Sequence, residues 1–444
     1  MEDAWSNTTG GRVRADVTLA ARARRTLAEN YEWLLILSVL LLLSTKTLFN
    51  APMIFMALIT LYRLYRNRRP ILTDPAVRFM GVLFLCFWVP MVLSLPGAAD
   101  LERAASTARD FLRFPLDGIF MIQALRVPRN RERLFLGVFL TLTVWSLDGM
   151  LQFFAGRDLL GYPYQGAELT GVFFPYLRFG LVIATVAPLF FEGLRRYGRR
   201  RRWLWLLLVP YVACVFLSGN RTSWMMLSVA VLGYGIFLYR AYGGVAWYKV
   251  VAAAVGIFVV LGLLAVKQPW FESRVQTTLG LFSGNYQEID RATSYRLSIW
   301  KTAINVFEHH WINGIGPRGF RYVYRDYAGP HDFWQHQNPP EAPTHPHQEL
   351  LEILAGTGVP GGIGLVLFFW VLARRLRASS PQVATAAMPW VVGTVVAMNP
   401  LNVHMSFYAS YWSTVAWWLL LLAVAEWGAA REGARNLPPN VDTR

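Results

Sequence analysis

An arginine stands at the junction of two apolar runs of the sequence, within the polar segment Ser218–Ser223. Arg221 is the only charged residue of that junction. A guanidinium at the mouth of a membrane protein is costly unless it is paired or serves a ligand, and its fork of N–H donors suits phosphate oxygens. Two interpretations follow: Arg221 binds an anion, or its side chain extends to lipid headgroups as interfacial arginines do.

A second segment with arginines, Asp290–Ala303, ends with the apolar spacing of a helix. Arg296 would lie near the start of that helix, where free backbone N–H groups also favour an anion. Arg291 lies five residues earlier. The alternative is a surface salt bridge from either arginine to Asp290 or Glu288.

The stretch Gly314–Phe320 is rich in glycine and contains Arg318. It lacks the preceding strand and the Lys-Ser/Thr ending of a phosphate-binding P-loop, so it predicts a structural turn. Arg318 and Arg291 are further candidates for contact with an anion.

A histidine precedes an apolar run in the segment Thr344–Gly362. Pro346 before His347 indicates the start of a helix that enters the membrane. Histidine titrates near neutrality, which suits His347 to proton transfer. The alternatives are a helix cap and a metal pair with His345. Because the two histidines are two residues apart, they would not share one face of a helix, which disfavours the metal pair.

No Asp-x-Asp motif occurs in the chain. An enzyme of this sequence that handles a diphosphate would therefore neutralise it with arginines and not with a cation held by carboxylates. We expect no metal and no cofactor.

The composition indicates which solvent surrounds these residues. Of 444 residues, 55% are hydrophobic, which is too much apolar surface for one water-soluble globule. The net charge of +16 comes from short basic clusters between apolar runs, a pattern that excludes a nucleic-acid-binding face. The sequence predicts an all-α polytopic membrane protein.

Apolar runs recur along the chain, many of them near the roughly 20 residues that a span requires. They predict about twelve transmembrane helices. The basic clusters lie in the loops between these helices, on one side of the membrane. The runs cover residues 31–49, 51–65, 77–95, 109–125, 134–154, 170–191, 203–218, 222–239, 249–266, 348–373, 384–402 and 407–426.

Arginine-rich loops alternate with loops that hold isolated charges, which places both termini in the cytoplasm. One long segment, rich in Trp, Tyr, His and Pro, is then a folded periplasmic cap. The predicted organisation is a cytoplasmic segment 1–30, helices one to nine over 31–266, the periplasmic loop over 267–346, helices ten to twelve over 347–426, and a cytoplasmic tail 427–444.

The assembly of these motifs resembles the O-antigen ligase family. The family pattern of His, Asn/Ser/Gln, nine residues, Gly, two residues and Gly/Thr/Tyr is met by His347, Gln348, Gly358 and Gly361. The family's two extracytoplasmic arginines resemble Arg221 and Arg296. The sequence departs from the family at Asn220, where serine is more usual.

This resemblance implies a glycosyltransferase of the GT-C type that needs no metal. It would transfer a polysaccharide from undecaprenyl diphosphate to lipid A–core at the periplasmic face of the bacterial inner membrane, with inversion at the anomeric carbon. His347 would be the catalytic residue. Arg221, Arg296, Arg291 and Arg318 would bind the diphosphate, and membrane lipids would surround the protein.

Three other functions fit parts of the same pattern. An O-antigen polymerase shares the donor and uses a growing glycan as acceptor. A protein O-oligosaccharyltransferase uses the same type of donor but commonly extends well past its last helix. A transporter or flippase for an anionic lipid would also place arginines in a membrane cavity, but it would not need the His347 motif.

Overall fold

A computed structural model of the chain describes residues 31–435, except 167, most of 244–268, 331, 338–341 and 404. The described residues form helices and connecting loops, and their one β-type contact is an isolated bridge between Arg157 and Pro163. The all-α prediction is confirmed for this part of the chain. The predicted segment 1–30 and the predicted span 249–266 lie mostly or wholly outside the described residues.

The helices before the cap follow the apolar runs of the sequence. They are Tyr31–Leu42, α2 (Asn50–Thr73), α3 (Pro75–Leu93), η1 (Leu95–Gly97), α4 (Leu101–Phe111), α5 (Arg113–Ala124), α6 (Pro128–Ala155), η2 (Gly171–Phe173), α7 (Phe179–Gly198), η3 (Arg202–Leu207), α8 (Leu208–Leu217) and α9 (Arg221–Tyr242).

The cap, defined here as residues 269–346, contains short helices, and longer helices follow it. The cap helices are α11 (Pro269–Leu279), η4 (Gly280–Phe282), α12 (Tyr286–Ala292), α13 (Arg296–His309), α14 (Phe320–Tyr327) and η5 (Phe333–His336). The later helices are α15 (Glu349–Arg377), α16 (Pro381–Ala397) and α17 (Ser410–Arg435).

Five described helices are long and apolar enough to cross a membrane, namely Pro75–Gly97, Pro128–Ala155, Arg221–Tyr242, Glu349–Arg377 and Ser410–Ala434. The protein is therefore a multi-pass membrane protein. Helix α17 is buried on nearly all sides, as expected of an apolar helix at the centre of a bundle. It packs against α16, α5 and α3, and Trp418 at its middle donates its indole N–H to the carbonyl of Ile36 at 3.1 Å.

The structure corrects three boundaries of the predicted runs. The run 109–125 is two helices, α4 and α5, because Pro115 has no N–H to continue the helix across Leu112. In the run 170–191, the helix begins only at Phe179. The predicted tail begins as helix, since α17 continues to Arg435 and buries Trp427 against Phe79.

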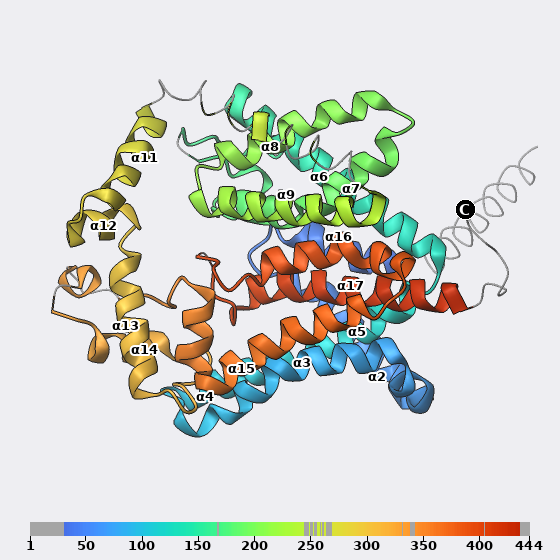
Figure 1. The fold of residues 1–444 in the computed structure, drawn as a ribbon, viewed down its shortest axis with the longest axis horizontal. Coiled ribbons are helices and arrows are strands. Elements are labelled where there is room, and N and C mark those ends of the chain that lie inside the picture. Colours follow the sequence, from blue (N-terminus) through green and yellow to red (C-terminus); the bar gives the residue numbers. More distant parts are fainter. Residues whose placement is uncertain are drawn as a thin grey trace, which may run out of the picture.

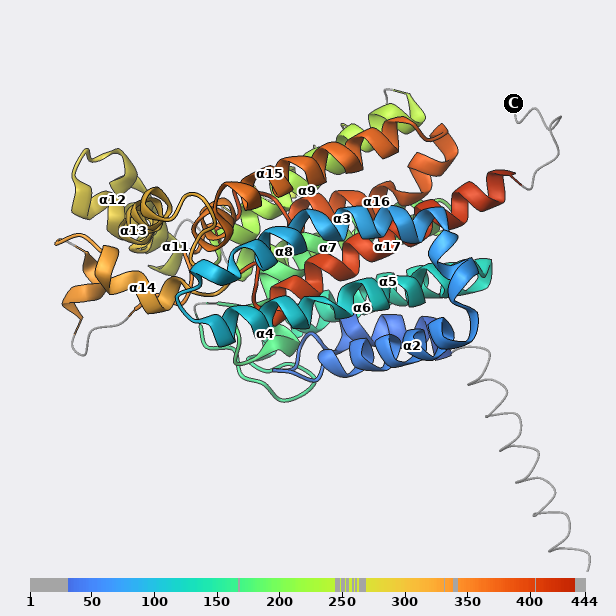
Figure 2. The ribbon, with the colours of Figure 1, turned by 90° about the horizontal axis from the view of Figure 1, so that it is seen from below.

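The cap lies at one end of the bundle. Figure 1 shows α11, α12, α13 and α14 together at the left, whereas α2 and the last turns of α17 lie at the right. Figure 2, from a perpendicular direction, shows the same separation. The cap has a small core of its own, Ile299, Ala303, Val306, Ile315, Phe320, Tyr324 and Ala355. Because Ala355 belongs to α15, this core also fixes the cap to the bundle.

This arrangement generates a prediction about sidedness. Reporter proteins fused at Arg68, Arg131, Arg200 and Arg377 should give cytoplasmic signals, whereas a reporter within residues 276–290 should give a periplasmic signal. The reason is the excess of arginine at the end of the bundle opposite the cap. A cytoplasmic signal from the 276–290 fusion would contradict the orientation.

Candidate active site

The first site arginine begins helix α9. Asn220 is the N-cap of this helix, and its side chain accepts a hydrogen bond from the Thr222 N–H at 2.9 Å. The Arg221 guanidinium donates to the hydroxyls of Thr278, at 3.3 Å, and Ser294, at 3.0 Å. Arg221 therefore reaches from the bundle into the cap. These contacts show that its side chain is engaged within the protein and does not simply extend to lipid headgroups.

The second site arginine begins helix α13 after an unusual turn. Ser294 and Tyr295 both have a φ of 59°, in the left-handed region that non-glycine residues seldom adopt. The buried carboxylate of Asp290 holds this turn, because it accepts from the Ser298 N–H at 3.1 Å and from the Ser298 hydroxyl at 2.6 Å. The turn thus fixes where Arg296 begins its helix.

The salt-bridge alternative for these arginines is wrong. The Asp290 carboxylate is occupied by Ser298, and among the described residues no ion pair joins Arg291 or Arg296 to Asp290 or Glu288.

Arg221 and Arg296 lie close enough to repel each other. Burial lowers the pKa of the Arg296 guanidinium, and the positive charge of Arg221 lowers it further. Both arginines are also the first residues of helices, whose N-termini carry partial positive charge. Two guanidinium groups and two helix N-termini together form a site that an anion with several oxygens would stabilise.

His347 lies in the loop immediately before α15. Gln348 caps that helix through a hydrogen bond from the Leu351 N–H to its side-chain oxygen, so the interpretation of His347 as the helix cap is wrong. The φ of His347 is 52°, again in the left-handed region, which histidine tolerates better than most residues. The imidazole ring packs on that of His345, with centroids 3.8 Å apart.

The contact between the two histidines corrects a sequence-based argument. Their separation by two residues was expected to keep them on different faces of a helix. Both lie before the helix, where a left-handed residue turns the chain and brings the rings together. Because the two rings are in contact, a substitution of His345 would disturb His347 and could not serve as a control in experiments on His347. Among the described residues, no group of three or more His, Cys, Asp or Glu side chains is arranged to hold a metal ion.

The loop between α16 and α17 joins the histidine to the first arginine. The Gln348 amide donates to the carbonyl of Pro400 at 2.7 Å, and the Glu349 N–H donates to the carbonyl of Asn402 at 3.0 Å. From the other side, the Thr222 hydroxyl donates to the carbonyl of Val403 at 3.2 Å. Residues 400–403 therefore hold the start of α9 and the start of α15 next to each other.

Two buried acids in the first turn of α15 support this junction. Glu352 accepts from the Ser406 hydroxyl and, at 2.9 Å, from the Phe407 N–H. One oxygen of Glu349 has no hydrogen-bond partner among the described residues, although its side chain is only 2% exposed. The sequence analysis assigned these acids no role. The sequence did contain a signal for such a role, because two carboxylates stand in an apolar run at the predicted membrane boundary.

The glycine-rich turn packs against a break in α15. A Cβ on Gly314, whose φ is 68°, would lie 2.5 Å from the backbone of Gly356. Helix α15 breaks at Gly358, which has a φ of 62° and closely approaches the backbone of Trp311 and Asn313. Only residues without a side chain allow two backbones to approach this closely. The first segment of α15, which follows His347, is thereby set at a fixed angle.

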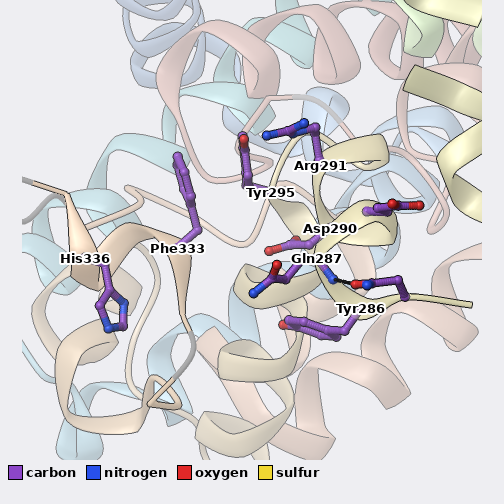
Figure 3. A pocket seen from close by; sticks show the side chains of 9 residues that line it. Tyr286, Gln287, Asp290, Arg291, Tyr295, Phe333 and His336 are labelled. Atoms are coloured by element: carbon purple, nitrogen blue, oxygen red, sulfur yellow. Dashed lines mark hydrogen bonds between the residues drawn. The ribbon is translucent and has the colours of Figure 1, made fainter. Parts of the chain in front are cut away.

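The two other predicted arginines have different surroundings from this pair. Arg291 is exposed and lines a hollow in the cap (Figure 3). Arg318 belongs to a different basic group: burial lowers its pKa, and the positive charges of Arg103 and Arg321 lower it further. The structure therefore brings together Arg221, Arg296 and the His347 loop, but not Arg318.

A further arginine at this end of the bundle was missed by the sequence analysis. Arg178 precedes α7, and its guanidinium lies over the rings of Tyr411, at 4.0 Å, and Tyr176, at 4.3 Å. The apolar run had been extended back to residue 170, which hid this charge within a predicted span. The charge of Arg178 inside an apolar run was the feature of the sequence that could have indicated a functional residue.

The segment that contains this geometry also carries a family signature. Residues 204–366 match the sequence family described as O-antigen ligase. This match extends from η3 into α15 and includes Arg221, Arg296 and His347. A comparison with curated proteins finds no match to the chain. The match shows that this part of the chain, residues 204–366, is similar to the O-antigen ligase family.

Proposed function

We propose that the protein is an O-antigen ligase that transfers a polysaccharide from undecaprenyl diphosphate to lipid A–core. The match of residues 204–366 to the O-antigen ligase family supports a transferase role in general. One observation carries the specific proposal: Arg221, Arg296 and the His347 loop lie together at the end of the bundle that bears the cap. Residues 400–403 hold the starts of α9 and α15 next to each other there. An anion site beside an imidazole suits transfer from a lipid diphosphate to a hydroxyl.

The proposed reaction is a single displacement. The oxygen of an acceptor hydroxyl bonds to the anomeric carbon while the bond from that carbon to the diphosphate oxygen breaks, which inverts the anomeric configuration. His347 accepts the hydroxyl proton. The electron pair of the broken bond stays on undecaprenyl diphosphate, whose charge increases, and Arg221 and Arg296 stabilise that charge.

The architecture that goes with this proposal is a GT-C-type membrane enzyme with about twelve spans and its active site toward the periplasm of the inner membrane. The five apolar helices and the cap at one end of the bundle support such an arrangement. Both substrates are amphiphiles, so a site at the boundary between cap and bundle lets each keep its lipid part in the bilayer.

The central test is transfer in proteoliposomes that contain purified protein, lipid-linked polysaccharide and lipid A–core. We expect covalent transfer at the same rate with and without EDTA, because arginines and not a metal neutralise the diphosphate. Loss of transfer in EDTA, restored by a divalent cation, would contradict the metal-independent mechanism. Extension of the lipid-linked glycan would instead identify a polymerase, and glycan on an added acceptor protein would identify an oligosaccharyltransferase.

The arginine pair provides a second prediction. Arg221→Ala and Arg296→Ala should each reduce kcat by about 10²–10³-fold, because each removes a preorganised donor to a developing anion. Lysine at either position should restore activity only in part, since it lacks the planar fork. Arg157→Ala, an exposed arginine in the loop after α6, is the control. Normal rates in both site variants, at equal membrane levels, would place the diphosphate elsewhere.

The third prediction isolates the imidazole of His347. His347→Asn keeps a residue that tolerates the left-handed conformation but removes the base, so kcat should fall by about 10²–10⁴-fold. His309→Ala, which alters an exposed histidine at the end of α13, should retain activity. Donor binding should persist in His347→Asn, measured with the lipid-linked donor alone. Wild-type activity in this variant would exclude His347 as the base.

A further inference from the structure

The cap contains two adjacent hollows, each of about 600 Å³, which is within the usual size of small-molecule sites. Both are lined by Asn285, Tyr286 and Gln287 at the start of α12. Figure 3 shows the first hollow, with Gln287 and Arg291 of α12 facing Phe333 and His336 of η5. The second shares Asn285–Gln287 with the first and is also lined by Ser298, Lys301, Gly329, Pro330 and Asp332.

The chemistry of the lining is polar with aromatic ring faces. The rings of Tyr295 and Phe333 stack with centroids 3.6 Å apart, and the Lys301 ammonium lies 3.8 Å from the centre of the Tyr286 ring. The amides of Asn285 and Gln287 offer both hydrogen-bond donors and acceptors. A sugar has the complementary surface, because its ring presents C–H groups on its faces and hydroxyls around its rim.

The hollows are preformed. The Asn285 side chain caps α12 through the Gln287 N–H at 2.9 Å, and the hydroxyl of Tyr286 lies 3.1 Å from that of Ser298. The Trp334 indole donates to the carbonyl of Tyr295 at 3.1 Å, which ties η5 to the turn before α13. A lining held in this way loses little conformational entropy when a ligand binds.

The first hollow lies beside the arginine pair. Tyr295 lines it and is followed directly by Arg296, and the preceding Ser294 accepts the hydrogen bond from Arg221. The first sugar of a lipid-linked glycan is bonded to the diphosphate. A diphosphate held by the two arginines would therefore direct its glycan toward this hollow.

We propose that the two hollows form one groove that binds the glycan of the donor beyond its first sugar. This inference rests on the proposed function, since the arginine pair supplies the starting point of the glycan. The second sugar and those next to it lie beside Arg291 and Tyr295, and later ones pass Asn285–Gln287 toward Lys301. The groove thereby selects polymeric donors over donors with a single sugar.

Two measurements separate the groove from the proposed reaction. The first is binding of the delipidated polysaccharide, isolated from the cells that make the protein, to the full-length purified protein by calorimetry. The second is transfer to lipid A–core from two donors, undecaprenyl diphosphate with the whole polysaccharide and the same lipid with one sugar. The variants are Gln287→Ala and Phe333→Ala. The control is Phe282→Ala, which changes a cap aromatic that is 84% exposed and lies outside both hollows.

Each groove variant should weaken polysaccharide binding, and raise the KM of the polymeric donor, by about three- to tenfold, the effect of one lost polar or aromatic contact. The KM of the single-sugar donor and both kcat values should change by less than about twofold. The Phe282→Ala protein should behave as wild type. Polysaccharide binding that is absent in wild type, or equal in wild type and both variants, would overturn the groove. Binding that depends on the groove, without transfer from either donor, would support the groove and overturn the proposed reaction.

Discussion

Two guanidinium groups held near each other, those of Arg221 and Arg296, form the constraint on which the rest of this site depends. Their repulsion favours separation, so the surrounding structure must hold them in place. The Asn220 cap fixes the start of α9, and the Asp290–Ser298 hydrogen bonds fix the start of α13. An anion between the two guanidinium groups would relieve this repulsion, so the geometry suits a ligand with several negative oxygens.

The parts of the fold that follow from local periodicity could be predicted from the sequence. The predicted apolar runs that fall within the described residues contain helices, because burial in a bilayer or a bundle requires a continuous apolar surface. Arg221, Arg296 and His347, which the structure brings together, also stood out in the sequence, since charged residues at the ends of apolar runs are easily recognised. The boundaries were less accurate: the consequence of Pro115 within a run and the charge of Arg178 were both overlooked.

The contacts between distant segments could not be predicted in this way. Arg221 and Ser294 are 73 residues apart, and their hydrogen bond depends on the left-handed turn at Ser294 and Tyr295, which no propensity favours for these residues. The stacking of His345 on His347 likewise depends on a left-handed residue outside the helix. Residues 400–403 gave no signal in the sequence, because they act through backbone carbonyls that every residue possesses.

The proposed roles divide between the two parts of the molecule. Arg221 and the His347 loop are fixed to the bundle by residues 400–403, whereas Arg296 and the groove belong to the cap. The proposed diphosphate site is therefore complete only while the cap is in place on the bundle. The seating depends on Ala355 in the cap core, on the close approach of Gly314 to Gly356, and on the bond from Arg221 to Ser294. A donor diphosphate that contacted both arginines would add a contact between cap and bundle, so donor binding and correct placement of the cap would stabilise each other.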